Sequence, residues 1–177
     1  MRPIKQAQRL PDQNFDSTER LYRRVPPSCI GLDDDVEASC IRCSFGKEIE
    51  SSPSVVRAKY GTIRDTLSRL CADGKDVSSE VVFWISVKSL PNGVLSGANV
   101  PHDFYPFHAP LSDCFAHTVI ACRQADSPPG AYKEPSRPVK NEFRAKFAAA
   151  LERAEIPSLP VAVLQSLKRR WALRRIR

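Results

Sequence analysis

Six cationic side chains in the last ten residues are the strongest chemical signal in this 177-residue chain. Lysine and arginine neutralise phosphates, and a tryptophan among them can stack on a base or lie at a membrane interface. The six account for all but one unit of the formal net charge of +7, so the basic charge is local. This predicts contact with nucleic acid, an anionic membrane surface or an acidic protein surface. The residues concerned are Lys168, Arg169, Arg170, Trp171, Arg174, Arg175 and Arg177.

An apolar stripe runs through the same C-terminal segment. Leu164, Leu167 and Trp171 recur at helical spacing after Pro160, which predicts a helix with cations around one apolar face. If that face finds no groove within the chain, it needs one on a partner. A protein groove is therefore a second candidate for what the basic helix contacts.

A cluster of hydroxyl, cationic and aromatic side chains at 51–60 is the main candidate for a catalytic or phosphate site. Arg57 and Tyr60 belong to it, and His117 is a third polar group that an enzyme could use with them. The competing interpretation is a turn with Tyr60 anchored in the core, which we favour because no glycine-rich cradle is present. Cys114 and His117 do not form a nucleophile and base, since three residues along a strand place them on opposite faces. A structural, hydrogen-bonded His117 is therefore expected.

The six cysteines are expected to be reduced thiols. The start of the chain has no apolar secretory signal and no run of about 18 apolar residues exists, so a cytoplasmic protein is predicted. Cys40 and Cys43 have the spacing of two zinc ligands, but no second such pair completes a site. Buried cysteines on a strand are the favoured interpretation, and no cofactor is predicted.

The elements that would position these groups indicate an α+β fold, with a compact mixed or antiparallel sheet and a short helix followed by two C-terminal helices. Alternation and β-branching predict strands at 21–25, 36–45, 81–87 and 115–122. A capped helix is predicted from Thr62 to Gly74, and a long aromatic loop over 89–112. The predicted organisation is a weakly ordered lead-in at 1–20, an α+β domain at 21–125, a proline-rich joint at 126–138, and helices within 139–177, from Val139 to Glu155 and after Pro160.

Three segments together resemble a small uncharacterised bacterial domain family. They are an LYRR-type opening at 21–24, an SVxRxKY-type centre at 54–60 and an AHxxI-type close at 116–120. The resemblance covers roughly residues 20 to 122 and implies a compact α+β domain linked to defence or mobile-element systems, with no established activity. A fainter comparison is with ADP-ribosyltransferase-like folds, which would use Arg23 or Arg24, Ser52 or Ser54, and Glu80.

The sequence thus favours a non-enzymatic accessory or adaptor subunit of a larger, multi-protein bacterial assembly. Its basic C-terminal helix would contact nucleic acid or a protein partner. The alternative is a small enzyme, ADP-ribosyltransferase-like or nuclease-like, with a site near Arg57, Tyr60 and His117.

Overall fold

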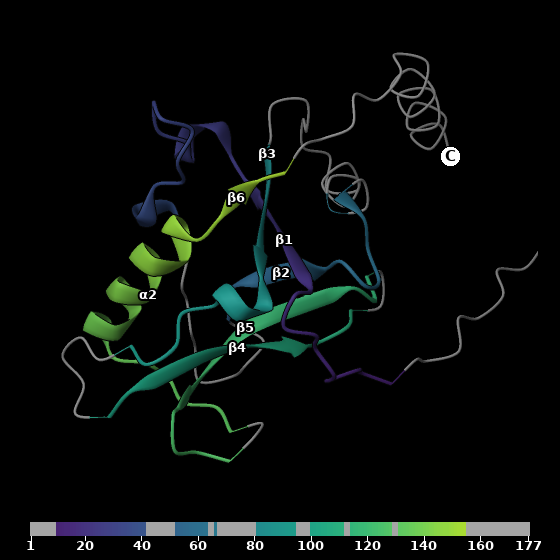
Figure 1. Ribbon diagram of the computed structural model, residues 1–177, viewed down its shortest axis with the longest axis vertical. Coiled ribbons are helices and arrows are strands. Elements are labelled where there is room, and N and C mark those ends of the chain that lie inside the picture. The colour runs from purple at the N-terminus through teal and green to yellow at the C-terminus, as the bar shows by residue number, and fades with distance from the viewer. Residues whose placement is uncertain are drawn as a thin grey trace, which may run out of the picture.

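A single six-stranded antiparallel sheet organises the molecule in the computed structural model, which describes residues 10–41, 52–63, 66, 81–94, 100–111, 114–128 and 131–154. The strand order across the sheet is β4-β5-β2-β1-β3-β6. Figure 1 shows β1 and β3 running across the direction of β4 and β5, so the sheet is strongly twisted. The strands are β1 (Arg20–Val25), β2 (Ser54–Arg57), β3 (Val81–Ser86), β4 (His102–His108), β5 (His117–Gln124) and β6 (Glu152–Arg153).

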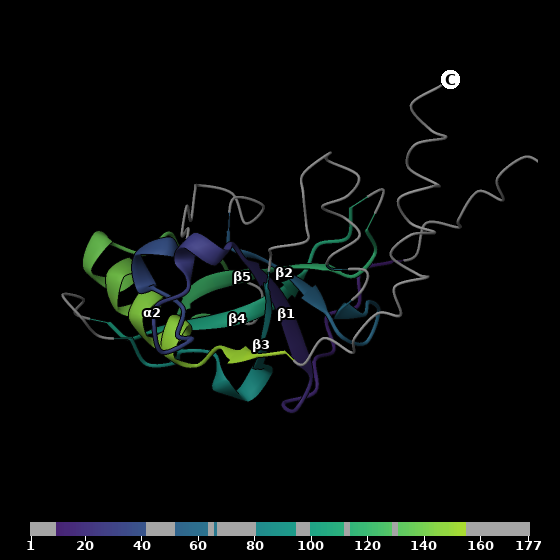
Figure 2. The same ribbon diagram turned by 90° about the horizontal axis from the view of Figure 1, so that it is seen from above.

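One face of the sheet carries the hydrophobic core. Leu21 of β1 pairs with Ile85 of β3, and because successive strand residues point to opposite faces, Val25 and Phe83 lie on the same face as this pair. Helix α2 (Arg137–Ala149) packs on this face, as Figures 1 and 2 show. Its buried residues Val139, Phe143, Phe147 and Ala148 belong to the same core cluster as those strand residues.

The prediction that the sheet is followed by two C-terminal helices is wrong. Among the described residues α2 is the one long helix, and it ends at Ala149. The chain then turns back to the sheet as β6, where the Ala154 N–H donates to the Val82 carbonyl at 2.9 Å. The apolar face predicted for 139–155 is confirmed, because Phe143 and Phe147 are fully buried and Leu151 packs on the core. The predicted basic helix after Pro160 lies outside the described residues.

Two other predicted elements also differ from the structure. The predicted loop at 89–112 contains β4, which tolerates Pro106 because it is an edge strand of the sheet. The strand predicted at 36–45 is replaced over Ala38–Cys40 by a short 3-10 helix, η2. The strand predictions for 21–25, 81–87 and 115–122 are confirmed as β1, β3 and β5, with shifts at their ends. Most of the helix predicted at 62–74 lies outside the described residues.

A disulfide between Cys29 and Cys40 overturns the prediction that all six cysteines are thiols. Their Cα atoms are 5.6 Å apart, and the bond closes the loop that leads from η1 (Pro27–Cys29) to η2. Arg144 of α2 holds this loop on the core by donating from Nε to the Ile41 carbonyl at 3.1 Å. Cys114 and Cys122 are free thiols, and burial raises the pKa of the Cys122 thiol to about 12.

Removal of this disulfide is expected to destabilise the protein. Its cysteines are 11 residues apart. Closing a loop of this length lowers the conformational entropy of the unfolded chain and so stabilises the folded state by about 3 kcal/mol. The double variant Cys29→Ser/Cys40→Ser should therefore unfold at a lower urea concentration, and dithiothreitol should lower the wild-type midpoint by the same amount. Cys114→Ser is the matched control and should respond to dithiothreitol as the wild type does. Equal midpoints with and without reductant in the wild type would contradict the prediction.

No helix in the described parts of the chain has both the length and the apolar character needed to cross a membrane.

Candidate functional site

The three motif segments form adjacent strands in the structure. Tyr22 of the first pairs with Val56 of the second, and Val56 pairs with His117 of the third, so the LYRR, SVxRxKY and AHxxI segments lie on β1, β2 and β5. The turn after β2 packs closely on them. A Cβ at Gly61 would approach Val56 Cγ1 to 2.8 Å and Ala116 Cβ to 3.0 Å, so glycine is required for this close packing.

Arg57, the central residue of this arrangement, is completely buried. Its Nε donates to Glu19 Oε1 at 2.7 Å and its Nη2 to Glu19 Oε2 at 3.0 Å, which is a two-point contact with one carboxylate. Nη1 donates to the Asp12 carbonyl at 2.6 Å, and Nη2 also donates to the Asn14 carbonyl. All three guanidinium nitrogens are thus engaged by residues 12–19, which we call the N-terminal strap.

Aromatic rings enclose the guanidinium. Its central carbon lies 3.9 Å from the centroid of the Phe15 ring and 5.1 Å from that of Tyr60. The Tyr60 ring stacks on His108 with centroids 5.4 Å apart, and its hydroxyl donates to Asp12 Oδ2 at 2.5 Å. Tyr60 is therefore anchored, as the sequence favoured.

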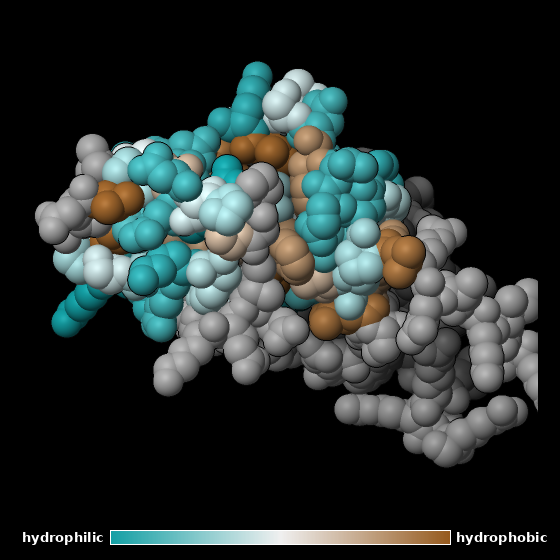
Figure 3. Space-filling view, turned by 90° about the horizontal axis from the view of Figure 1, so that it is seen from below, coloured by the Kyte–Doolittle hydropathy of each residue, from teal (hydrophilic) through white to brown (hydrophobic). Residues whose placement is uncertain are grey.

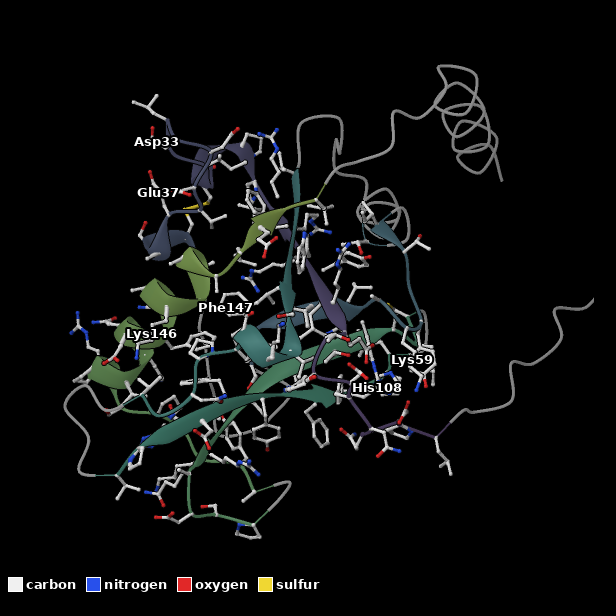
Figure 4. The ribbon with its side chains drawn as sticks, viewed as in Figure 1. Asp33, Glu37, Lys59, His108, Lys146 and Phe147 are labelled. Atoms are coloured by element: carbon white, nitrogen blue, oxygen red, sulfur yellow. A yellow bond between two sulfur atoms is a disulfide. The ribbon has the colours of Figure 1, made fainter. Side chains whose placement is uncertain are left out.

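His108 is fully buried, and its two ring nitrogens have distinct roles. Nδ1 accepts from the Asp12 N–H at 2.8 Å, so Nε2 carries the proton and donates to the Phe115 carbonyl at 2.5 Å. The Gln13 side chain pairs with the His108 backbone in both directions, at 3.1 and 3.0 Å. These contacts hold the N-terminal strap on the end of β4; Figure 4 shows His108 beside Lys59 there, well away from Asp33 and Glu37 of the disulfide loop.

Asp12 is the most perturbed acid of this cluster. The Lys59 ammonium, which donates to Oδ2 at 2.9 Å, holds the pKa of the Asp12 carboxyl far below its usual value, and the Tyr60 hydroxyl and Asn14 N–H act in the same direction. Asp12 in turn raises the pKa of Lys59. We name the set Asp12, Glu19, Arg57, Tyr60 and His108 the Arg57 cluster.

Asp12→Asn is expected to change the pH dependence of stability. A carboxyl whose pKa is lowered on folding contributes stability above its unfolded pKa, and this contribution disappears as the pH falls through the folded value. The variant should therefore have a lower urea midpoint than the wild type at pH 7, and the gap should close on the acid side. Tyr60→Phe removes one donor to the Asp12 carboxylate. The difference between its urea midpoint and that of the wild type should therefore also shrink as the pH falls. A gap that does not change between pH 7 and pH 3 would refute this role.

The structure separates the three residues of the enzyme hypothesis. Arg57 pairs with Leu21 and so shares the core face, whereas His117 pairs with Val56 on the opposite face. His117 Nδ1 is 2.6 Å from the Ala109 carbonyl, which confirms the expected structural hydrogen bond. Arg57 and Tyr60 do lie together, but the N-terminal strap occupies both. The cluster therefore functions as an internal clamp for the strap.

The other predicted site residues are placed as follows. Arg23 donates to the backbone carbonyl of Ser54 at 3.2 Å, while Glu80 lies outside the described residues. Cys40 is bonded to Cys29, and the described residues contain no group of metal-ligating side chains. The predicted partner-binding residues also lie outside the described part of the chain: Leu164, Leu167, Lys168, Arg169, Arg170, Trp171, Arg174, Arg175 and Arg177.

Sequence reasoning missed a cationic and aromatic surface on the face of the sheet opposite α2. Arg20, Tyr22 and Arg24 alternate along β1 and point to this face, and Tyr22 pairs in register with Trp84 of β3. Arg20 is exposed, and its guanidinium carbon lies 4.2 Å from the centroid of the Trp84 ring. Part of the signal was present in the sequence, since residues 20, 22 and 24 share one parity and Leu21 and Val25, with Arg23 between them, share the other.

Hydrophobic side chains do not gather into one large patch on the face shown in Figure 3, where the described residues form small brown groups among hydrophilic ones. The large hydrophobic side chains exposed in the described part are Leu10, Leu32 and Leu111, which come from three separate loops. No family model, no curated protein and no solved structure matches this chain.

Proposed function

We propose that this protein is a non-catalytic accessory or adaptor subunit of a larger bacterial assembly, and that its cationic C-terminal segment contacts nucleic acid. The concentration of charge supports the proposal most directly. Six of the last ten residues are Lys or Arg, and the rest of the chain is close to neutral. Neutralisation of phosphates by such a segment releases counterions and gives sequence-independent affinity.

The state of the Arg57 cluster favours a binding protein over the enzyme alternative. A catalytic arginine or phosphate-binding arginine needs donors that face a substrate. The three nitrogens of Arg57 instead donate to Asp12, Asn14 and Glu19, and its side chain is fully buried. Substrate could reach these donors only if the N-terminal strap were displaced.

An acidic groove on a protein partner is the second candidate for the contact. The observation that favours it is the apolar stripe Leu164, Leu167 and Trp171, which accompanies the cations at helical spacing. The two candidates differ in how strongly salt weakens binding and in whether replacing Leu164 and Leu167 weakens it. Nucleic-acid binding depends on the cations, whereas groove binding depends on the stripe as well.

Fluorescence anisotropy with labelled single-stranded and duplex oligonucleotides tests the proposal. The full chain should bind with an affinity that falls steeply with salt, and a chain without residues 168–177 should lose most of that affinity and of the salt slope. A matched pair separates charge from chain length: replacement of the six cations by Gln should resemble the deletion, and exchange of the arginines for Lys should retain binding. Equal, salt-insensitive binding by the full and shortened chains would refute the proposal. Loss of partner capture on Leu164→Ala/Leu167→Ala without loss of oligonucleotide binding would favour the protein groove for partner contact.

A further inference from the structure

We propose that Arg57, Lys59 and Tyr60 form a phosphate-binding site, and that Asp12 of the N-terminal strap occupies this site as a built-in competitor. The ligand would be inorganic phosphate or a phosphate monoester. The site is closed in the structure because a carboxylate of the same chain fills it. This inference goes beyond the proposed function, since it does not depend on what the C-terminal segment contacts.

Three donors converge on one oxygen of Asp12. The Lys59 ammonium donates to Oδ2 at 2.9 Å and the Tyr60 hydroxyl at 2.5 Å, while Nη1 of Arg57 lies 3.3 Å from the same oxygen. All three donors come from β2 and the turn that follows it, so one short stretch of backbone fixes their spacing. Charged and hydroxyl donors in such an arrangement bind oxyanions.

The charges of the cluster favour an anion at this place. Two cations, Arg57 and Lys59, face two carboxylates, so departure of the Asp12 side chain leaves one excess positive charge. Glu19 stays with Arg57, because its own carbonyl accepts from the Val87 N–H at 3.0 Å. The donors already stabilise a negative charge here, since Lys59 above all lowers the pKa of the Asp12 carboxyl.

A phosphate would use these donors more fully than the Asp12 carboxylate does. In the structure a single oxygen, Oδ2, faces all three of them, while Oδ1 accepts from the Asn14 N–H within the strap at 2.9 Å. A phosphate monoester offers three terminal oxygens, so each donor can have its own acceptor. It also carries more negative charge than a carboxylate and gains more from the excess positive charge.

The occupant can exchange without opening the core. The side chains of Lys59 and Asp12 are 49% and 19% exposed, and Pro11 and Gln13 on either side of Asp12 are exposed as well. Movement of residues 10–13 would therefore vacate the site towards solvent. The hydrogen bond from the Asp12 N–H to His108 opposes this movement, so the strap competes with the ligand and lowers its apparent affinity.

Vacating the site by substitution tests the inference without any movement of the strap. Asp12→Ala removes the carboxylate but keeps the main-chain hydrogen bonds of residue 12. Isothermal titration calorimetry at constant ionic strength should show that this variant binds inorganic phosphate at least about 10-fold more tightly than the wild type. Asp12→Asn is the matched control, because its amide fills the same space, and it should bind phosphate more weakly than Asp12→Ala.

Variants of the donors show whether phosphate binds at this place. In the Asp12→Ala background, Lys59→Met should weaken phosphate binding by about 10-fold or more, as loss of a hydrogen bond to a charged group does. Lys146→Met, which removes an exposed cation of α2, should leave the affinity unchanged. An oligothymidylate with and without a 5′-phosphate separates the two sources of phosphate. Tighter binding of the phosphorylated form assigns the site to a nucleic-acid end, and equal binding assigns it to free phosphate.

Three results would overturn the inference. The first is failure of Asp12→Ala to bind phosphate, and the second is phosphate binding that Lys59→Met does not weaken. The third is equal affinity of the wild type and Asp12→Ala, which would show that Asp12 does not compete with the ligand. If Asp12→Ala does not fold, Asp12→Ser vacates most of the same space and is judged by the same results. None of these results bears on the proposed function of the C-terminal segment.

Discussion

Replacement of Arg57 by methionine is expected to lower the free energy of unfolding by about 3–5 kcal/mol. The substitution removes a fully buried cation and leaves the Glu19 carboxylate, which is 9% exposed, without its two-point partner. The Asp12 and Asn14 carbonyls lose their donors in the same step. Urea denaturation followed by circular dichroism measures the loss.

Companion variants show whether the loss comes from the unpaired charge. Arg57→Lys keeps the positive charge but cannot make the two-point contact with the Glu19 carboxylate, so it should also be strongly destabilising. Addition of Glu19→Leu to Arg57→Met removes the stranded carboxylate and should recover part of the stability, which a double-mutant cycle quantifies. If Arg57→Met is as stable as the wild type, the N-terminal strap is not held by this residue.

The Arg57 cluster explains why the functional interpretation of residues 51–60 could not be decided from sequence. Arginine, tyrosine and hydroxyl groups near a turn are typical of both phosphate sites and buried polar clamps. The choice depends on where the acidic partners come from, and Asp12 and Glu19 are 45 and 38 residues away from Arg57 in the chain. No local pattern encodes that pairing.

The elements with strong local patterns were predictable. β3 is a β-branched and aromatic run, which is typical of a buried strand. The apolar residues of α2 recur at helical spacing, which predicts a helix with one buried face. β4 was missed because prolines at 101, 106 and 110 indicate a loop, and only the strand order shows that Pro106 lies at an edge. β6 is two residues long and depends entirely on its pairing with β3.

The surface at Arg20, Tyr22, Arg24 and Trp84 was readable in part. Alternation along 20–25 puts Arg20, Tyr22 and Arg24 on one face and Leu21, Arg23 and Val25 on the other, so the outward row could be predicted from β1 alone. The pairing of Tyr22 with Trp84 could not, since it depends on the register of two strands 62 residues apart. The sequence thus contained the side chains of this surface but not their juxtaposition.

Phe143→Ala is expected to destabilise the whole domain by about 3–5 kcal/mol, because it opens a cavity between α2 and the sheet. The Phe143 side chain is fully buried and stacks on Phe104 of β4, with ring centroids 4.1 Å apart, and on Phe147 at 5.1 Å. Figure 4 shows Phe147 on the side of α2 that faces the strands. A helix packed in this way unfolds with the sheet, so circular dichroism and tyrosine fluorescence should report one shared transition.

The size-conserving variant Phe143→Leu provides the control for this prediction. It retains most of the buried apolar volume and should cost about 1.5 kcal/mol or less. Ala145→Ser, on the exposed side of the same helix, should change the midpoint little. If Phe143→Ala instead unfolds in two separate transitions, with the signal from the sheet unchanged, α2 is an appended helix. The proline-rich joint before the helix predicted such an arrangement. A single transition at a lower urea concentration would make α2 and β6 integral to the sheet domain.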